Sequence, residues 1–116
     1  MADLRLVVIT DNQDFQTKAQ NYLGDKEPSA EYFPIPAPMR APGVIGMLSP
    51  TNVALDLSLI GADSFMADIR NAAEKVNAKL IFFSTHVHAN GEKIAHAQKA
   101  IWCNETKADA FTTWLL

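Results

Sequence analysis

Residues 53–57 read Val-Ala-Leu-Asp-Leu, an apolar run that carries a single acid, Asp56. Aspartate is depleted in β-strands and is rarely buried without a partner. An acid in this position is therefore expected at the carboxyl end of a strand, where open α/β sheets bind ligands. Residues 4–10 (Leu-Arg-Leu-Val-Val-Ile-Thr) form a similar run, and Asp11 follows them directly. The pattern predicts that Asp11 and Asp56 share one site at one edge of a sheet.

Strand and helix patterns alternate along the whole chain. Apolar runs predict strands over 4–10, 53–57, 79–84 and 101–103, and a short edge strand over 31–35. Helical spacing of apolar residues predicts helices over 12–23, from a cap at Asp63 or Ser64 to 77, over 91–100, and beyond a capping box at Thr106. Gly24 is expected to end the first helix. This order predicts a parallel sheet with helices on both faces.

All six prolines lie between Pro28 and Pro50. Proline lacks the amide donor that a central strand needs, so residues 33–38 cannot form one. The sequence predicts a loop over 36–50, with at most one helical turn near 43–48. Long loops in compact domains are usually functional or mobile, and a permissive surface connection is the simpler interpretation here.

Composition limits the classes of function. A chain of 116 residues suits one domain with one core. The net charge of −3 argues against direct binding to nucleic acid. No apolar run approaches the roughly 20 residues of a membrane span, and the first residues lack the pattern of a signal peptide. Cys103 is the single cysteine and is expected in the core, which fits a cytoplasmic protein without disulfides.

Four stretches together resemble the receiver domain of bacterial response regulators. Residues 8–12 (Val-Ile-Thr-Asp-Asn) resemble its first-strand motif, and residues 53–57 resemble its phosphoacceptor strand. Residues 81–86 (Ile-Phe-Phe-Ser-Thr-His) resemble its fourth strand, and residues 101–103 (Ile-Trp-Cys) its short fifth strand. The resemblance implies a CheY-like, flavodoxin-like fold: a doubly wound five-stranded parallel sheet of order 2-1-3-4-5. The proline-rich segment would replace or shorten the second helix.

The resemblance also implies roles for individual residues. Asp56 would be the phosphoacceptor, whose carboxylate attacks phosphorus. Mg²⁺ would be held by Asp11, Asp56 and the backbone carbonyl of Ser58, and would neutralise the phosphoryl oxygens. Ser84 would contact the phosphate and change rotamer on activation, and Trp102 would be the aromatic residue that reports this change.

The chain departs from the family pattern at two charged positions of this site, and it also lacks the family's proline shortly after Asp56, in Ser58-Leu59-Ile60. Thr10 stands where the first acid of the metal site is expected, and Asn104 or Glu105 stands where the family has a lysine. Lys107 lies two or three residues further on. Without a lysine, repulsion between Asp11 and Asp56 would be uncompensated, so Asp56→Asn is expected to stabilise the metal-free protein.

Two interpretations of function remain open. In the first, the chain takes part in a two-component phosphorelay and receives a phosphoryl group from a histidine kinase on Asp56. In the second, it is a pseudo-receiver that acts as a protein-interaction module without phosphorylation, and Mg²⁺ binding is weak or absent. Neither interpretation makes it an enzyme beyond phosphorylation and dephosphorylation of its own Asp. In both, the partner is a kinase or another signalling protein, and a homodimer is compatible with either.

A weaker hypothesis concerns three histidines. His86 and His88 form an H-x-H pair, and His96 lies on the following predicted helix. Such a set could bind zinc. Polar residues in the loop after a strand explain the pair more simply.

Overall fold

A parallel sheet forms the centre of the computed structural model, which describes residues 4–86, 90–104 and 107–115. Its strands are β1 (Arg5–Ile9), β2 (Glu31–Ile35), β3 (Asn52–Asp56), β4 (Lys79–Phe83) and β5 (Ile101–Trp102). They are arranged in the order β2-β1-β3-β4-β5, and every neighbouring pair is parallel. This is the predicted flavodoxin-like topology.

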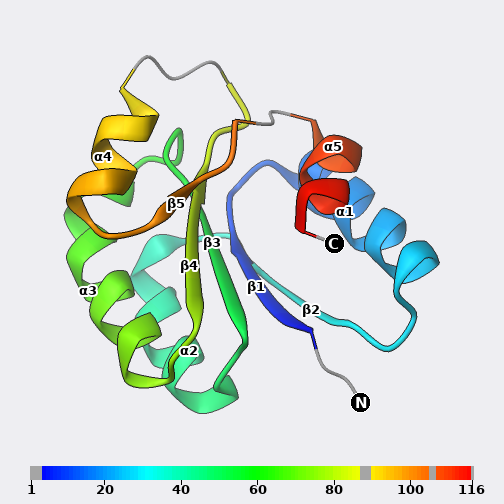
Figure 1. The fold of residues 1–116 in the computed structure, drawn as a ribbon, viewed down its shortest axis with the longest axis horizontal. Helices are drawn as coiled ribbons and strands as arrows, with labels where there is room; N and C mark the ends of the chain where they lie inside the picture. The colour runs from blue at the N-terminus through cyan, green and yellow to red at the C-terminus, as the bar shows by residue number, and fades with distance from the viewer. Residues whose placement is uncertain (1–3, 87–89, 105–106, 116) are drawn as a thin grey trace.

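Two layers of helices cover the sheet (Figure 1). Helices α1 (Gln13–Lys26) and α5 (Ala108–Leu115) pack on one face, and α2 (Ala41–Leu48), α3 (Ala62–Lys75) and α4 (Gly91–Ala97) pack on the other. Alternate strand residues point into opposite cores, as the apolar runs predicted. The core under α2, α3 and α4 receives Val7, Ile9, Val53, Leu55 and Phe82. The core under α1 and α5 receives Leu6, Val8, Ala54, Ile81 and Phe83.

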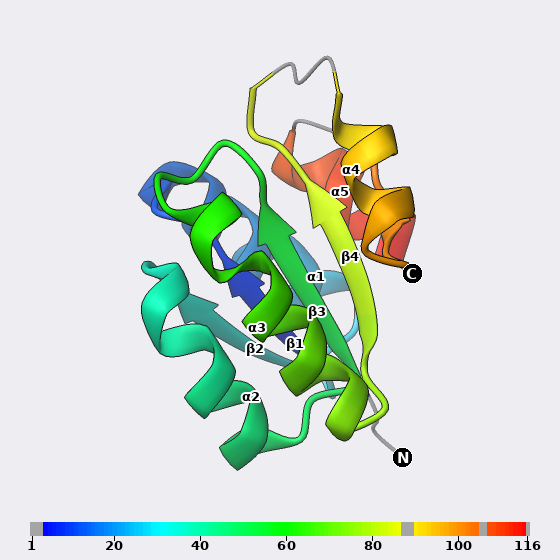
Figure 2. The same cartoon turned by 90° about the vertical axis from the view of Figure 1, so that its left-hand side faces the viewer.

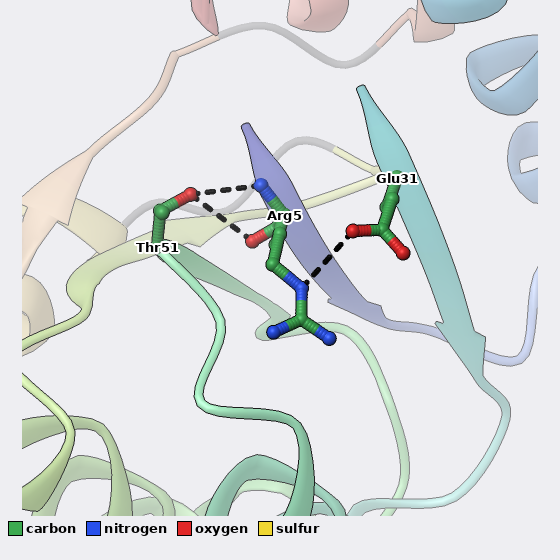
Figure 3. A network of polar contacts seen from close by, with 3 residues as sticks. All are labelled: Arg5, Glu31 and Thr51. Atoms are coloured by element: carbon green, nitrogen blue, oxygen red, sulfur yellow. Dashed lines mark hydrogen bonds and ion pairs between the residues drawn. The ribbon is translucent and has the colours of Figure 1, made fainter. Parts of the chain in front are cut away.

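Polar contacts join three segments at the amino-terminal edge of the sheet (Figure 3). The backbone N–H of Arg5 donates to Thr51 Oγ1 at 2.9 Å, and Thr51 Oγ1 donates back to the Arg5 carbonyl at 3.2 Å. Arg5 Nε lies 3.2 Å from a carboxylate oxygen of Glu31 on β2. These contacts hold the starts of β1, β2 and β3 in register, at the end of the sheet opposite Asp56.

The predicted loop over 36–50 is wrong, because this segment is largely helical. A short 3₁₀ helix, η1 (Pro38–Arg40), runs into α2, which has 8 residues. Pro38 and Pro42 stand in the first turn of η1 and α2 respectively, where the missing proline N–H has no helical partner to lose. Ser49 ends α2 in the left-handed conformation, with φ of 47°. The second helix is thus present, with 8 residues, and is not replaced by a loop.

Two predicted helix ends also differ from the structure. Helix α1 continues through Gly24 to Lys26, because Gly24 does not adopt the left-handed conformation of a helix stop. Helix α3 begins after Gly61, whose φ of 90° turns the chain into the helix without a side-chain cap, so neither Asp63 nor Ser64 is the cap. The predicted cap at Thr106 lies outside the described residues. No helix in the described part of the chain has the length and apolar content of a membrane span.

Candidate functional site

Asp56 is the last residue of β3 and is buried, with only 1% of its surface exposed. The register places it beside Phe83 of β4, while its neighbour Leu55 pairs with Ile9 of β1. Leu57 N–H donates to the Phe83 carbonyl at 2.8 Å and extends this pairing past the acid. The residues that follow β1 and β4 therefore meet around the Asp56 carboxylate.

Three hydroxyl groups donate to this carboxylate, and we call Thr10, Ser58 and Thr85 the hydroxyl cage. Thr10 Oγ1 donates to Asp56 Oδ2 at 2.7 Å, and Thr85 Oγ1 lies 3.2 Å from the same oxygen. Ser58 Oγ donates to Oδ1 at 2.6 Å, and the backbone N–H groups of Ser58 and Thr85 donate to Oδ1 at 2.9 and 3.3 Å. Both oxygens of a buried acid are thus satisfied by neutral donors.

Thr10 is fixed tightly in this arrangement. It is fully buried, its N–H donates to the Ile35 carbonyl at 3.0 Å, and its Oγ1 also accepts from Asn12 N–H at 3.2 Å. An acid at this position would face Asp56 at hydrogen-bond distance and repel it, whereas a threonine donates to it. The sequence showed the loss of an acid at Thr10 but did not indicate that its replacement would become a donor to Asp56.

Thr85 is a second site residue that sequence reasoning missed. The predicted contact residue, Ser84, is buried, and its Oγ accepts a hydrogen bond from His86 N–H at 3.2 Å. Among the described residues, no hydrogen bond joins Ser84 to Asp56. Both residues follow the end of β4 at Phe83, where the chain bends, and Thr85 is the one whose hydroxyl and N–H face the acid. The motif Ser-Thr showed that a hydroxyl follows β4 but not which one would point inward.

The predicted metal ligands lie near the carboxyl edge of the sheet in different surroundings. Asp11 is exposed beyond β1, and its carboxylate makes no hydrogen bond or ion pair with the described residues. Ser58 presents its N–H to Asp56. Within the described residues, no group of three or more His, Cys, Asp or Glu side chains could hold a metal. Mg²⁺ prefers oxygen ligands in near-octahedral geometry, and both Asp56 oxygens already accept hydrogen bonds, so Asp56 would have to give up some of these bonds to bind the ion.

The fifth strand supplies no cation to the site in the described part of the chain. Asn104 is exposed, Lys107 is exposed beside the start of α5, and the ion pairs of the described residues do not include Asp56. Glu105 lies outside the described residues. The same holds for His88, so the zinc hypothesis concerns a set that the structure does not describe in full.

Trp102 lies on β5, half-buried against α4. A Cβ atom added to Gly91, the first residue of α4, would lie 2.2 Å from an indole carbon of Trp102. The indole therefore rests directly on the backbone at the start of α4 and couples that helix to β5.

Comparison with known proteins gives the fold. No protein-family profile matches the chain, and no curated protein sequence matches it. Solved structures match over almost the full length. The signal receiver domain of a DNA-binding response regulator (merR) from Colwellia psychrerythraea 34H has 20% identity and a TM-score of 0.75, covering 97% of this chain and 98% of that one. The chemotaxis protein CheY4 of Vibrio cholerae has 12% identity and a TM-score of 0.79, covering 98% and 97%.

A third structure agrees with these two. The signal receiver domain of the response regulator NarL from Mycobacterium tuberculosis has 19% identity and a TM-score of 0.71, covering 99% of this chain and 95% of that one. The chain therefore has the CheY-like receiver fold of two-component response regulators. At these identities the comparisons establish architecture, and the activity has to be argued from the residues at the end of β3.

Proposed function

We propose that this chain is a receiver-like signalling domain that acts by binding another protein and does not depend on phosphorylation of Asp56. One observation carries the proposal. The Asp56 carboxylate is buried and accepts hydrogen bonds from the hydroxyl cage and two backbone N–H groups, with no cation beside it among the described residues.

The physical argument concerns the cost of freeing the acid. A phosphoacceptor needs a lone pair directed at phosphorus and cations that neutralise the transferred group. Here an attacking oxygen would first have to lose hydrogen bonds, and a bond to a charged group contributes about 1.5–3 kcal/mol. The resting arrangement engages both carboxylate oxygens in hydrogen bonds, and among the described residues no ion pair brings a positive charge to Asp56. These contacts support a structural role for Asp56 in a domain that acts by docking to another protein.

Phosphoryl transfer to Asp56 is the second candidate, and one observation favours it. All the residues of the predicted site, namely Asp11, Asp56, Ser58 and Ser84, lie at the carboxyl edge of the sheet on or beside β1, β3 and β4. In this candidate a histidine kinase donates the phosphoryl group to Asp56. Ser84 contacts the phosphate, and Asp11, Asp56 and the Ser58 carbonyl hold Mg²⁺ after the hydroxyl cage rearranges.

Beryllofluoride, a phosphoryl mimic, separates the two candidates. The protein would be titrated with beryllofluoride and Mg²⁺ while the fluorescence of Trp102 and Trp114 is followed, with Asp56→Ala as the control. We expect the tryptophan fluorescence of wild type to match that of Asp56→Ala at every concentration of beryllofluoride. A saturable change that disappears in Asp56→Ala would overturn the proposal in favour of phosphoryl transfer.

A further inference from the structure

Helix α2 is apolar on every side. Its sequence, Ala-Pro-Gly-Val-Ile-Gly-Met-Leu, contains no charged or hydrogen-bonding side chain. Ala41 and Ile45 are buried against the sheet, whereas Gly43, Gly46 and Met47 face outward, and Met47 is 84% exposed. Helices that are hydrophobic on every side are normally buried on every side. The outer side of α2 is instead exposed, which suggests that another surface packs against it.

A groove of about 610 Å³ runs between α2 and α3. The two helices lie side by side on the same face of the sheet (Figure 2). One wall contains Met39, Gly43 and Gly46, and the other contains Phe65 and Ala72 from α3 and Val76, which follows it. We call these residues and Met47 the α2–α3 face. Exposed apolar patches of this kind mark interaction sites, and methionine side chains adapt readily to the shape of a partner.

Two opposite charges flank the groove on α3. Asp68 and Lys75 are both exposed, and neither forms an ion pair with another described residue. They are seven residues apart, which places them on the same side of the helix about two turns from each other. The two charges at the edge of the groove therefore sum to zero. If a second copy of the chain is rotated by 180°, its Lys75 can face Asp68 of the first copy, and its Asp68 can face Lys75.

We propose that the α2–α3 face binds a second copy of this chain across a twofold axis. In such an interface residue i contacts residue j while j contacts i, so Asp68 of each copy would face Lys75 of the other. The absence of side chains at Gly43 and Gly46 would allow Met47 of the second copy to approach α2 closely. The proposal is independent of the chemical state of Asp56.

Sedimentation equilibrium over a concentration series tests the apolar part of the interface. We expect wild type to form dimers and Met47→Asp to be monomeric while keeping its circular dichroism spectrum, since Met47 makes little contribution to the core. Ile101→Asp is the matched control: Ile101 is 40% exposed on β5, away from this face, and its variant should still dimerise. A wild-type protein that stays monomeric at every concentration would overturn the proposal. The α2–α3 face would then be a binding surface for a different protein.

Charge reversal tests the twofold pairing itself. D68K and K75D should each weaken self-association on the order of tenfold, because like charges then meet across the axis. An equal mixture of the two variants should form a heterodimer, since one chain carries two cations and the other two anions. The double variant D68K/K75D should recover the homodimer. Dimers that are unaffected by either single reversal, or a mixture that fails to associate, would contradict the proposed pairing.

Discussion

Thr10 and Asp56 lie at the ends of neighbouring strands, and Thr10 Oγ1 donates a 2.7 Å hydrogen bond to Asp56 Oδ2 across a separation of 46 residues in the sequence. The resemblance to receivers suggested a lost metal ligand at Thr10. In the structure Thr10 is instead a hydrogen-bond donor to Asp56. Removing a donor from a buried carboxylate destabilises the folded protein.

Removing this donor is expected to destabilise the fold. Thr10→Val keeps the shape of the side chain but takes one hydrogen bond from a charged acceptor, so the free energy of unfolding should fall by about 1.5–3 kcal/mol. Urea titration at neutral pH measures it. The matched control is Thr112→Val: this buried hydroxyl in α5 donates to the Ala108 carbonyl of its own helix, and the loss there should be under about 1 kcal/mol. Equal losses in the two variants would argue against a special role for the Thr10 donor.

The second prediction concerns the neutral variant Asp56→Asn. Repulsion between Asp11 and Asp56 would make this variant more stable than wild type, whereas the structure predicts that it is less stable. Asp56→Asn should lower the free energy of unfolding in Mg²⁺-free buffer by about 1–2 kcal/mol, because the cage donors would then meet a neutral acceptor in place of a charged one. A higher melting temperature for Asp56→Asn would instead indicate uncompensated repulsion with Asp11. Asp11→Asn is the control and should change little, because Asp11 is exposed.

Gly91 and Trp102 allow the coupling of α4 to β5 to be tested. Gly91→Ala would place a methyl group 2.2 Å from the indole, so the ring must move. Overpacking of this kind costs about 1–3 kcal/mol, and the Trp fluorescence spectrum should shift. In the control Gly24→Ala, nothing lies within 4 Å of the added carbon, and stability should rise by roughly 0.5–1 kcal/mol because alanine favours the helix. An unchanged spectrum in Gly91→Ala would mean that the indole does not rest on this backbone.

Tyr32 provides a prediction about pH. Its O–H donates to Gln16 Oε1, and Gln16 Nε2 donates to the Val8 carbonyl at 2.9 Å and lies 3.3 Å from the Thr10 carbonyl. Burial raises the pKa of the Tyr32 hydroxyl well above its ordinary value of about 10. The raised pKa means that the unfolded chain loses this proton at lower pH than the native protein does. The stabilisation is therefore complete below pH 10 and declines as pH rises above it.

The comparison of variants isolates this group. Tyr32→Phe should reduce the alkaline decline in the free energy of unfolding, while the control Tyr22→Phe should retain it. Chemical denaturation between neutral pH and pH 11 measures both. If Tyr32→Phe and wild type lose stability in parallel above pH 10, the Tyr32 hydroxyl does not contribute in this way.

Much of the architecture was predictable because buried parallel strands are apolar on both faces. The runs over 4–10, 53–57 and 79–84 marked β1, β3 and β4, and their alternation with helices predicted a parallel sheet, whereas the strand order was implied by the resemblance to receiver domains. The prolines of this segment favoured a loop over a helix, but Pro38 and Pro42 stand in first turns, where proline is tolerated, so α2 forms despite them.

The details of the site were less accessible to sequence reasoning. Asp56 could be placed at a strand end from its position after an apolar run. The choice between Ser84 and Thr85 depends on how the chain turns after β4, which is set by tertiary packing. The donor role of Thr10 depends on the register between β1 and β3, and a single sequence does not specify that register.

Intact-mass analysis after incubation with acetyl phosphate and Mg²⁺ tests the central claim most directly. Wild type would be compared with Asp56→Asn and with a Thr10→Asp/Asn104→Lys variant, which restores an acid beside Asp56 and a cation after β5. We predict no phosphoryl adduct on wild type or on Asp56→Asn, and an adduct on the restored variant. An adduct on wild type that Asp56→Asn abolishes would contradict the account and identify Asp56 as a working phosphoacceptor.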